Sequence, residues 1–317
     1  MTVFSVIAAV SIGLGALLLF LTPRQIGEAF ALTRPRELGL SMLLFFVGCA
    51  LMVERWRSCL SYRADRGKAF HTMGVCNAGN LLIPGRAGEP LRVYLLARLG
   101  VGAEYGTSAL VQERLADWML RVVFIGFAIL LSNTGSGEEL ASRLVGSLLI
   151  SLAVILILVG LVRRRETVAR LLGRSLGKLP RLQPESVESF LQRMLKDLSE
   201  VWTHPGGRMA VLWGFLAWLV FSFHTKYVLD CFIDHDTLAM SFLILALTPA
   251  TAPTQPGFFH GFAVAAMLIF GAEKVPALQA AVVAHMIQMI VFSLWGIASW
   301  FAIDRMLALD PEDSDED

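Results

Sequence analysis

Long apolar segments alternate with short polar segments along most of the chain, a pattern typical of membrane-spanning helices. A helix crosses a bilayer core with about 20 residues, a longer continuous apolar run than a soluble core helix keeps. The runs that reach or approach this length lie at residues 3–21, 38–53, 104–131, 144–162, 209–232 and 276–303. The pattern predicts an all-α polytopic membrane protein with a single transmembrane domain at residues 1–303 and an acidic tail at 304–317.

Two further apolar segments, at residues 70–99 and 237–270, are each interrupted by a polar stretch that is rich in proline and glycine. Proline removes a backbone donor, and the backbone groups that it leaves unpaired would find no water in hydrocarbon. Each segment is therefore predicted to enter the membrane as a short helix, turn and return, which adds two re-entrant broken helices to the bundle. The residues at the two predicted apices are Pro84, Gly85, Gly88, Pro253, Pro256 and Gly257.

Positive charge predicts the orientation of these segments. Residues 54–68 carry five basic side chains, and residues 163–165 are three consecutive arginines. Loops rich in lysine and arginine stay in the cytoplasm, so both chain termini are predicted to be cytoplasmic. The broken segments then enter from opposite sides, the arrangement of an inverted repeat, and broken helices in corresponding halves indicate a transport site between them.

Residues 166–208 form the longest segment that does not span, and their apolar positions repeat with a helical period. We expect cytoplasmic amphipathic helices here, within the transmembrane domain, because so short a piece buries little core of its own. The mean hydropathy of +0.63 is that of a polytopic membrane protein, and the net charge of +1 gives no support for nucleic-acid binding. The four cysteines have no paired spacing, so neither a metal site nor a disulfide scaffold is indicated, and no cofactor is expected.

Charged residues near the first apex are the strongest candidates for chemistry. Arg86, Glu89 and Arg92 follow the proline, and Glu113, Arg114 and Asp117 share one face of the next predicted helix. Two interpretations stay open for them, a solvated ion-pair face on an exposed helix or one buried network formed by both groups. Arg121 lies deeper in the apolar run and favours the buried network, because an arginine that faces lipid is costly.

Two other polar groups have simpler interpretations. The acidic and histidine residues between His224 and Asp236 match no metal-ligand spacing, so we interpret them as a solvated outer loop. His285 and Gln288 lie in the middle of the last span. They indicate either a hydrogen bond within the bundle or, at His285, a site of proton coupling.

Three motifs carry a family resemblance. The run N-x-x-x-P-G-R-x-G-E-x-x-R begins at Asn80, E-R-x-x-D begins at Glu113, and P-x-x-x-G-F begins at Pro253. Together they resemble the flippase-like family, the transmembrane region of lysylphosphatidylglycerol synthases and of related glycolipid-pathway proteins. The bifunctional synthases of that family carry a soluble aminoacyl-transferase domain, which we do not expect here because only the acidic tail follows residue 303.

The resemblance implies a flippase or scramblase that moves an anionic or aminoacylated phospholipid, or a polyprenyl-phosphate-linked lipid, between leaflets. We expect the bacterial cytoplasmic membrane as its location, and membrane lipids and a separate lipid-modifying enzyme as its partners. The alternatives are a membrane-embedded transferase acting on a lipid-linked sugar, which would need catalytic residues that no motif supplies, and a non-catalytic scaffold. The residues expected along the headgroup path are Asn80, Arg86, Glu89, Arg92, Glu113, Arg114, Asp117, Gln255 and His260.

Overall fold

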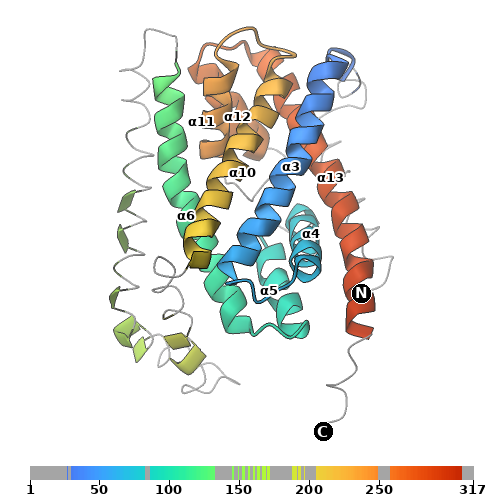
Figure 1. The fold of residues 1–317 in the computed structure, drawn as a ribbon. Helices are drawn as coiled ribbons and strands as arrows, with labels where there is room; N and C mark the ends of the chain where they lie inside the picture. Colours follow the sequence, from blue (N-terminus) through green and yellow to red (C-terminus); the bar gives the residue numbers. More distant parts are fainter. Residues whose placement is uncertain are drawn as a thin grey trace.

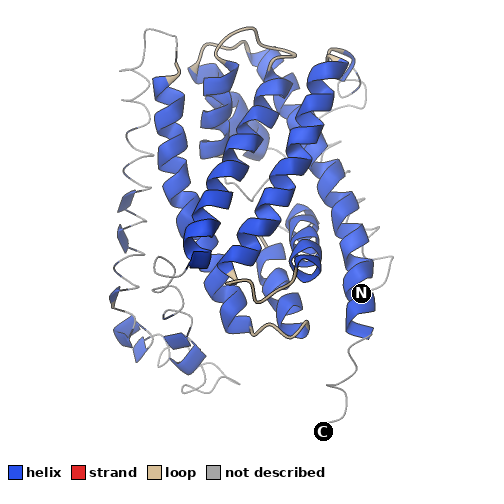
Figure 2. Cartoon of the chain, in the orientation of Figure 1, coloured by secondary structure: helices blue, strands red, loops and turns tan. Residues whose placement is uncertain are grey.

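The computed structural model describes residues 27, 30–82, 86–132, 205–248 and 258–308, together with single positions and short runs between 145 and 196. All regular structure in this part of the chain is α-helical (Figure 2). Four helices are long, α3 (Pro35–Cys59), α6 (Ala103–Leu130), α10 (Pro205–Leu229) and α13 (Lys274–Ala308). Four are shorter, α4 (Arg66–Leu82), α5 (Gly88–Arg98), α11 (Thr237–Leu247) and α12 (Phe258–Ile269).

Length and composition allow three of the described helices, α3, α10 and α13, to cross a membrane. Helix α6 is equally long, but four ionisable side chains lie near its middle, at Glu113, Arg114, Asp117 and Arg121. Those side chains are too costly for lipid contact, so α6 needs protein around its central turns. The observed helices confirm the predicted all-α membrane fold.

The two halves of the chain meet where α3 crosses α10, and small residues bring these helices close together. A Cβ atom added to Gly48 would lie 2.5 Å from the ring of Phe221, and one added to Gly214 would lie 3.1 Å from Nε of Arg55. Glycine therefore leaves room on each helix for a large side chain of the other. Close approach through small residues is the usual way in which helices associate in lipid, where burial of apolar surface supplies little force.

The short helices form two hairpins at opposite ends of the bundle. Helices α4 and α5 lie in the lower half of Figure 1, and α11 and α12 lie in the upper half. Both hairpins are held between the same two long helices, because α4 and α12 pack on α13 while α5 and α11 pack on α6. This arrangement agrees with the predicted pair of re-entrant broken helices that enter from opposite sides.

The sequence patterns placed two residues wrongly. Residues 54–59 were predicted to belong to a basic loop, but α3 continues through them and buries Arg55 completely. His224 was assigned to the edge of a solvated outer loop, yet it lies inside α10 with 1% of its surface exposed. Both positions fall on the inward stripe of an otherwise apolar helix, where the helical period outweighs the polarity of one side chain.

Several predicted segments lie outside the described residues. They are the span at 3–21, the predicted 304–317 tail beyond residue 308, where α13 ends, and, apart from single positions, the span at 144–162 and the amphipathic helices at 166–208. The two apices also lie outside, with Pro84, Gly85, Pro253, Gln255, Pro256 and Gly257.

Candidate functional site

The first hairpin is closed by the asparagine and the second glycine of its motif. Oδ1 of Asn80 accepts a hydrogen bond from the backbone N–H of Gly88 at 3.0 Å, and its amide donates to Sγ of Cys76 at 3.8 Å. The first N–H groups of a helix have no partner within the helix, so Asn80 satisfies one of them at the start of α5. Backbone meets backbone here, since a Cβ added to Gly79 would lie 3.0 Å from Cα of Gly88.

Gly88 is predicted to tolerate no side chain. A Cβ atom at this position would overlap the carbonyl oxygen of Cys76 and would lie 2.8 Å from the backbone nitrogen of Asn80. We expect Gly88→Ala to lower the free energy of unfolding in detergent micelles by about 2 kcal/mol or more, as overpacking does in cores. The matched control is Gly126→Ala on α6, where the new methyl group meets nothing within 4 Å. Equal stability of the two variants would contradict the tight closure.

Ion pairs join α3, α5 and α6 behind this hairpin. Arg92 contacts Glu113 at 2.6 Å, and Arg55 contacts Asp117 at 2.7 Å. Arg114 reaches Asp117 at 2.9 Å and Glu89 at 3.2 Å, and Glu89 also contacts Arg86 at 3.4 Å. We call this set the arginine–carboxylate network, and its members are Arg55, Arg86, Arg92, Arg114, Glu89, Glu113 and Asp117.

Burial divides the network into an inner and an outer part. The side chains of Arg55, Arg92 and Glu113 are between 0 and 2% exposed, whereas those of Arg86 and Arg114 are 29% and 21% exposed. The guanidinium of Arg92 also lies 3.6 Å from the ring centre of Trp56, a cation–π contact. Of the two interpretations that the sequence left open, the buried network is therefore correct.

Arg55 is the member of the network that the sequence patterns missed. Its Nη1 donates to Asp117, and its Nη2 donates to the backbone carbonyl of Glu113 at 2.7 Å. A signal was present, because Arg55 continues a stripe with helical spacing. That stripe consists of Ser41, Phe45, Gly48, Met52, Arg55 and Cys59.

Arg121 lies one turn beyond Asp117 on α6. Its guanidinium lies 4.5 Å from the ring centre of Trp118, and its Nε is buried without a hydrogen bond to any described residue. A fifth arginine therefore stands beside a network in which four arginines already share three carboxylates. Among these described side chains, five arginines face three carboxylates.

A cavity of about 100 Å³ runs from this network into the centre of the bundle. Its charged wall is formed by Glu89, Arg92, Glu113, Arg114 and Asp117. The rest of the lining is mostly aromatic and aliphatic, and it comes from α3, α4, α10, α11, α12 and α13. Its apolar residues are Phe45, Cys49, Met52, Met73, Trp218, Phe221, Ile244, Leu245, Phe259, Phe292 and Trp295.

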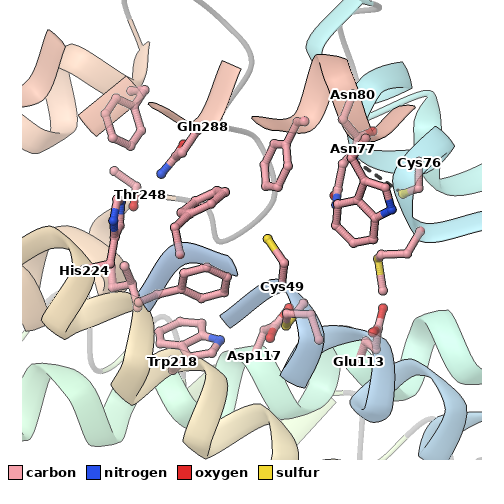
Figure 3. Close-up of a pocket in the computed structure, with 18 of the residues that line it drawn as sticks. Cys49, Cys76, Asn77, Asn80, Glu113, Asp117, Trp218, His224, Thr248 and Gln288 are labelled. Atoms are coloured by element: carbon pink, nitrogen blue, oxygen red, sulfur yellow. Dashed lines mark hydrogen bonds between the residues drawn. The ribbon is translucent and has the colours of Figure 1, made fainter. Parts of the chain in front are cut away.

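A second group of polar side chains lies across the cavity from the hairpin. Figure 3 shows His224, Thr248 and Gln288 together on one side, with Cys76, Asn77 and Asn80 on the other. The three come from α10, from the end of α11 and from α13. The cavity thus has a charged end, apolar walls and a polar, uncharged end.

Three further predicted site residues that the structure describes, Arg86, His260 and His285, lie beside the cavity. Arg86 reaches the network through Glu89, and it has a backbone φ of 61°. His260 and His285 are buried against each other, with ring centres 4.8 Å apart, and His285 stacks on Phe259 of the lining. Within the described part of the chain, no three His, Cys, Asp or Glu side chains are grouped closely enough to hold a metal ion.

Comparison with known proteins agrees with these observations. A family model described as "Lysylphosphatidylglycerol synthase TM region" matches residues 6–296. A stretch of 138 residues is 25% identical to the "Glycosyltransferase AglD" of Haloferax volcanii and covers 42% of this chain and 22% of that protein. No solved structure matches the chain. With apolar helices long enough to span and a family match over nearly its whole length, this multi-pass membrane protein belongs to the family of the lysylphosphatidylglycerol synthase transmembrane region.

Proposed function

We propose that this protein moves a lipid with a phosphate headgroup, a phospholipid or a polyprenyl-phosphate-linked lipid, between the two leaflets of the membrane. One observation carries the proposal: a cavity inside a membrane protein that joins an arginine-rich end to apolar walls. A lipid has the same two-part chemistry, with an anionic headgroup and apolar chains. The family and its lipid-related name place the protein in lipid or glycolipid pathways, and the transport step is our inference.

The charge of the network supports an anionic ligand. Arg55 and Arg92 are fully buried, and each has a carboxylate within 2.7 Å, so they are already neutralised. Arg86 and Arg114 share Glu89, Arg114 also contacts Asp117, which Arg55 holds as well, and these two arginines are the most exposed members of the network. A phosphate that met these two guanidinium groups would supply the missing negative charge, and arginine binds phosphate through two parallel hydrogen bonds.

The backbone at Arg86 supports the same assignment. Its φ of 61° lies in the left-handed region, which costs an arginine about 1 kcal/mol or more and which glycine would adopt freely. Strained residues of this kind gather at binding sites, where the surrounding fold holds them in place. An arginine at this position is therefore consistent with a need for its guanidinium group.

An aminoacyl headgroup receives less support than a simple anionic one. All three carboxylates of the network, Glu89, Glu113 and Asp117, already contact arginines. An ammonium group would meet a surface on which arginines outnumber carboxylates. The cavity therefore favours the phosphate of the lipid over a cationic substituent.

The two hairpins supply a route through the bundle. They reach toward its centre from opposite ends, and the cavity is lined by residues of both, such as Asn80 and Thr248. Irregular backbone at membrane depth is tolerated where it lines a polar cavity, and broken helices in two halves commonly flank a transport site. In this proposal the α4–α5 hairpin faces the cytoplasm and both chain termini lie on that side.

The test is the movement of fluorescent lipids in vesicles that contain the purified protein. The two lipid classes are phosphatidylglycerol, labelled on an acyl chain, and a polyprenyl phosphate, labelled on its isoprenoid chain, and the label is quenched from outside by dithionite. In protein-containing vesicles we expect dithionite to quench more fluorescence than the outer leaflet alone accounts for. The rate of this additional quenching should rise with the amount of protein. Rates equal to those of protein-free vesicles for both classes would refute the proposal.

A transferase acting on a lipid-linked sugar is the second candidate, and the name of the archaeal relative favours it. Glu89 or Asp117 would then be the general base. Each of these carboxylates contacts two arginines, but the side chain of Glu89 is 13% exposed and that of Asp117 is 7% exposed, so Glu89 is the more accessible to a substrate. Loss of product with intact lipid binding in Glu89→Gln would support this reaction with Glu89 as its base, and unchanged turnover in that variant would exclude Glu89 from that role.

A further inference from the structure

The uncharged polar end of the cavity has hydrogen-bonding capacity that the described protein does not use. We call His224, Thr248 and Gln288 the distal polar group. His224 is 1% exposed, and its Nδ1 lies 2.8 Å from Oγ and 3.0 Å from the carbonyl oxygen of Ser41. These contacts fix the ring between α3 and α10. Its Nε2 is buried without a hydrogen bond to any described residue.

Gln288 shows the same pattern from the opposite helix. Its Oε1 is buried, and no described residue donates a hydrogen bond to it. The hydroxyl of Thr248 donates to the carbonyl of Ile244 at 2.6 Å, which leaves its oxygen able to accept. Three helices thus present polar atoms to one side of the cavity (Figure 3). Buried polar groups are almost always paired, so unused ones that line a cavity indicate a bound molecule.

The chemistry of that molecule follows from the absence of charge. No cavity-lining residue contributed by α10, α11, α12 or α13 is acidic or basic, within the described parts of those helices, apart from the imidazole of His224. A charged group placed there would lose its hydration without a counter-ion, at high cost. A hydroxyl group fits, because it both donates and accepts and can therefore complement an imidazole nitrogen, a threonine oxygen and an amide.

We infer that the distal polar group is a subsite for the neutral hydroxyl groups of the lipid headgroup. The inference rests on the proposed function and names the lipid class: phosphodiester lipids whose headgroup ends in a glycerol or a sugar. The phosphate contacts the arginine-rich end, and the hydroxyls reach across the cavity to His224, Thr248 and Gln288. A cavity of about 100 Å³ has room for a small hydroxylated group.

The experiment compares two lipids that differ only in hydroxyl groups. Phosphatidylglycerol and phosphatidylpropanol carry the same phosphodiester charge and a three-carbon headgroup, and both are labelled on the acyl chain for the dithionite assay. We expect the protein to move phosphatidylglycerol faster by at least about tenfold, since sites that hydrogen-bond a hydroxyl reject analogues without it. In Gln288→Leu the ratio of the phosphatidylglycerol rate to the phosphatidylpropanol rate should fall to within about twofold of unity, because the leucine offers no hydrogen bond.

The control is Gln279→Leu, the same substitution on the same helix at a residue that does not line the cavity, and it should keep the ratio of the unmodified protein. Equal rates for the two lipids in the unmodified protein would overturn the subsite and assign the cavity end to water. If a stably folded Gln288→Leu protein moved neither lipid, the subsite would also be overturned. Movement of neither lipid by the unmodified protein would instead refute the transport proposal itself.

Discussion

Replacing Arg92 with methionine is expected to lower the free energy of unfolding by about 3–5 kcal/mol, because it breaks a fully buried ion pair. The partner Glu113 is 1% exposed, and the next guanidinium group, that of Arg114, is 4.0 Å away. Methionine fills much of the volume over Trp56, so the loss is mainly that of the charge. The measurement is denaturant-induced or thermal unfolding of the purified protein in detergent.

The control for Arg92 is Arg66→Met at the start of α4. Arg66 also contacts a glutamate, Glu54, at 2.8 Å, but its side chain is 78% exposed. Exposed ion pairs contribute about 0–1 kcal/mol, so this variant should unfold almost like the unmodified protein. A second change, Glu113→Gln, should restore part of the stability lost in Arg92→Met, because it removes the uncompensated carboxylate. Equal losses in the two arginine variants would show that burial of the network is unimportant.

The second large effect is expected in transport. Arg114→Gln should slow lipid movement by about ten- to a hundredfold, since a hydrogen bond to a charged group contributes about 1.5–3 kcal/mol. The fold should survive, because each carboxylate keeps another arginine: Glu89 keeps Arg86, Glu113 keeps Arg92 and Asp117 keeps Arg55. This is the opposite of Arg92, whose loss leaves Glu113 with only the guanidinium of Arg114, 4.0 Å away.

The control for transport is Arg98→Gln at the end of α5, an exposed arginine that contacts Tyr94 at 3.2 Å. It removes the same charge from the same hairpin without touching the network. We expect its dithionite rates to match those of the unmodified protein, with similar unfolding curves for both variants. If Arg98→Gln slows transport as much as Arg114→Gln does, general positive charge on the hairpin is responsible and the headgroup assignment to Arg114 is wrong.

Local patterns were sufficient for the helices and for the idea of two broken segments. The interrupted apolar segment predicted at 237–270 begins at the first residue of α11, and the run predicted at 104–131 differs from α6 by one residue at each end. The motif around Asn80 includes both partners of the hydrogen bond that closes the turn, because Asn80 accepts from the backbone N–H of Gly88. Hydropathy and turn chemistry act over a few residues, so one sequence is enough to read them.

Contacts between distant parts of the chain decided the rest. Arg55 and Asp117 are 62 positions apart, and Ser41 and His224 are 183 positions apart, yet each pair forms a buried hydrogen bond. A polar residue on an apolar stripe looks the same in sequence whether it faces lipid, a loop or a partner. The cost of burying it without a partner decides among these, and the partner is supplied only when the helices pack. Hydropathy therefore determined which segments enter the membrane, and packing determined which charges meet, where the cavity lies and which of its ends carries no charge.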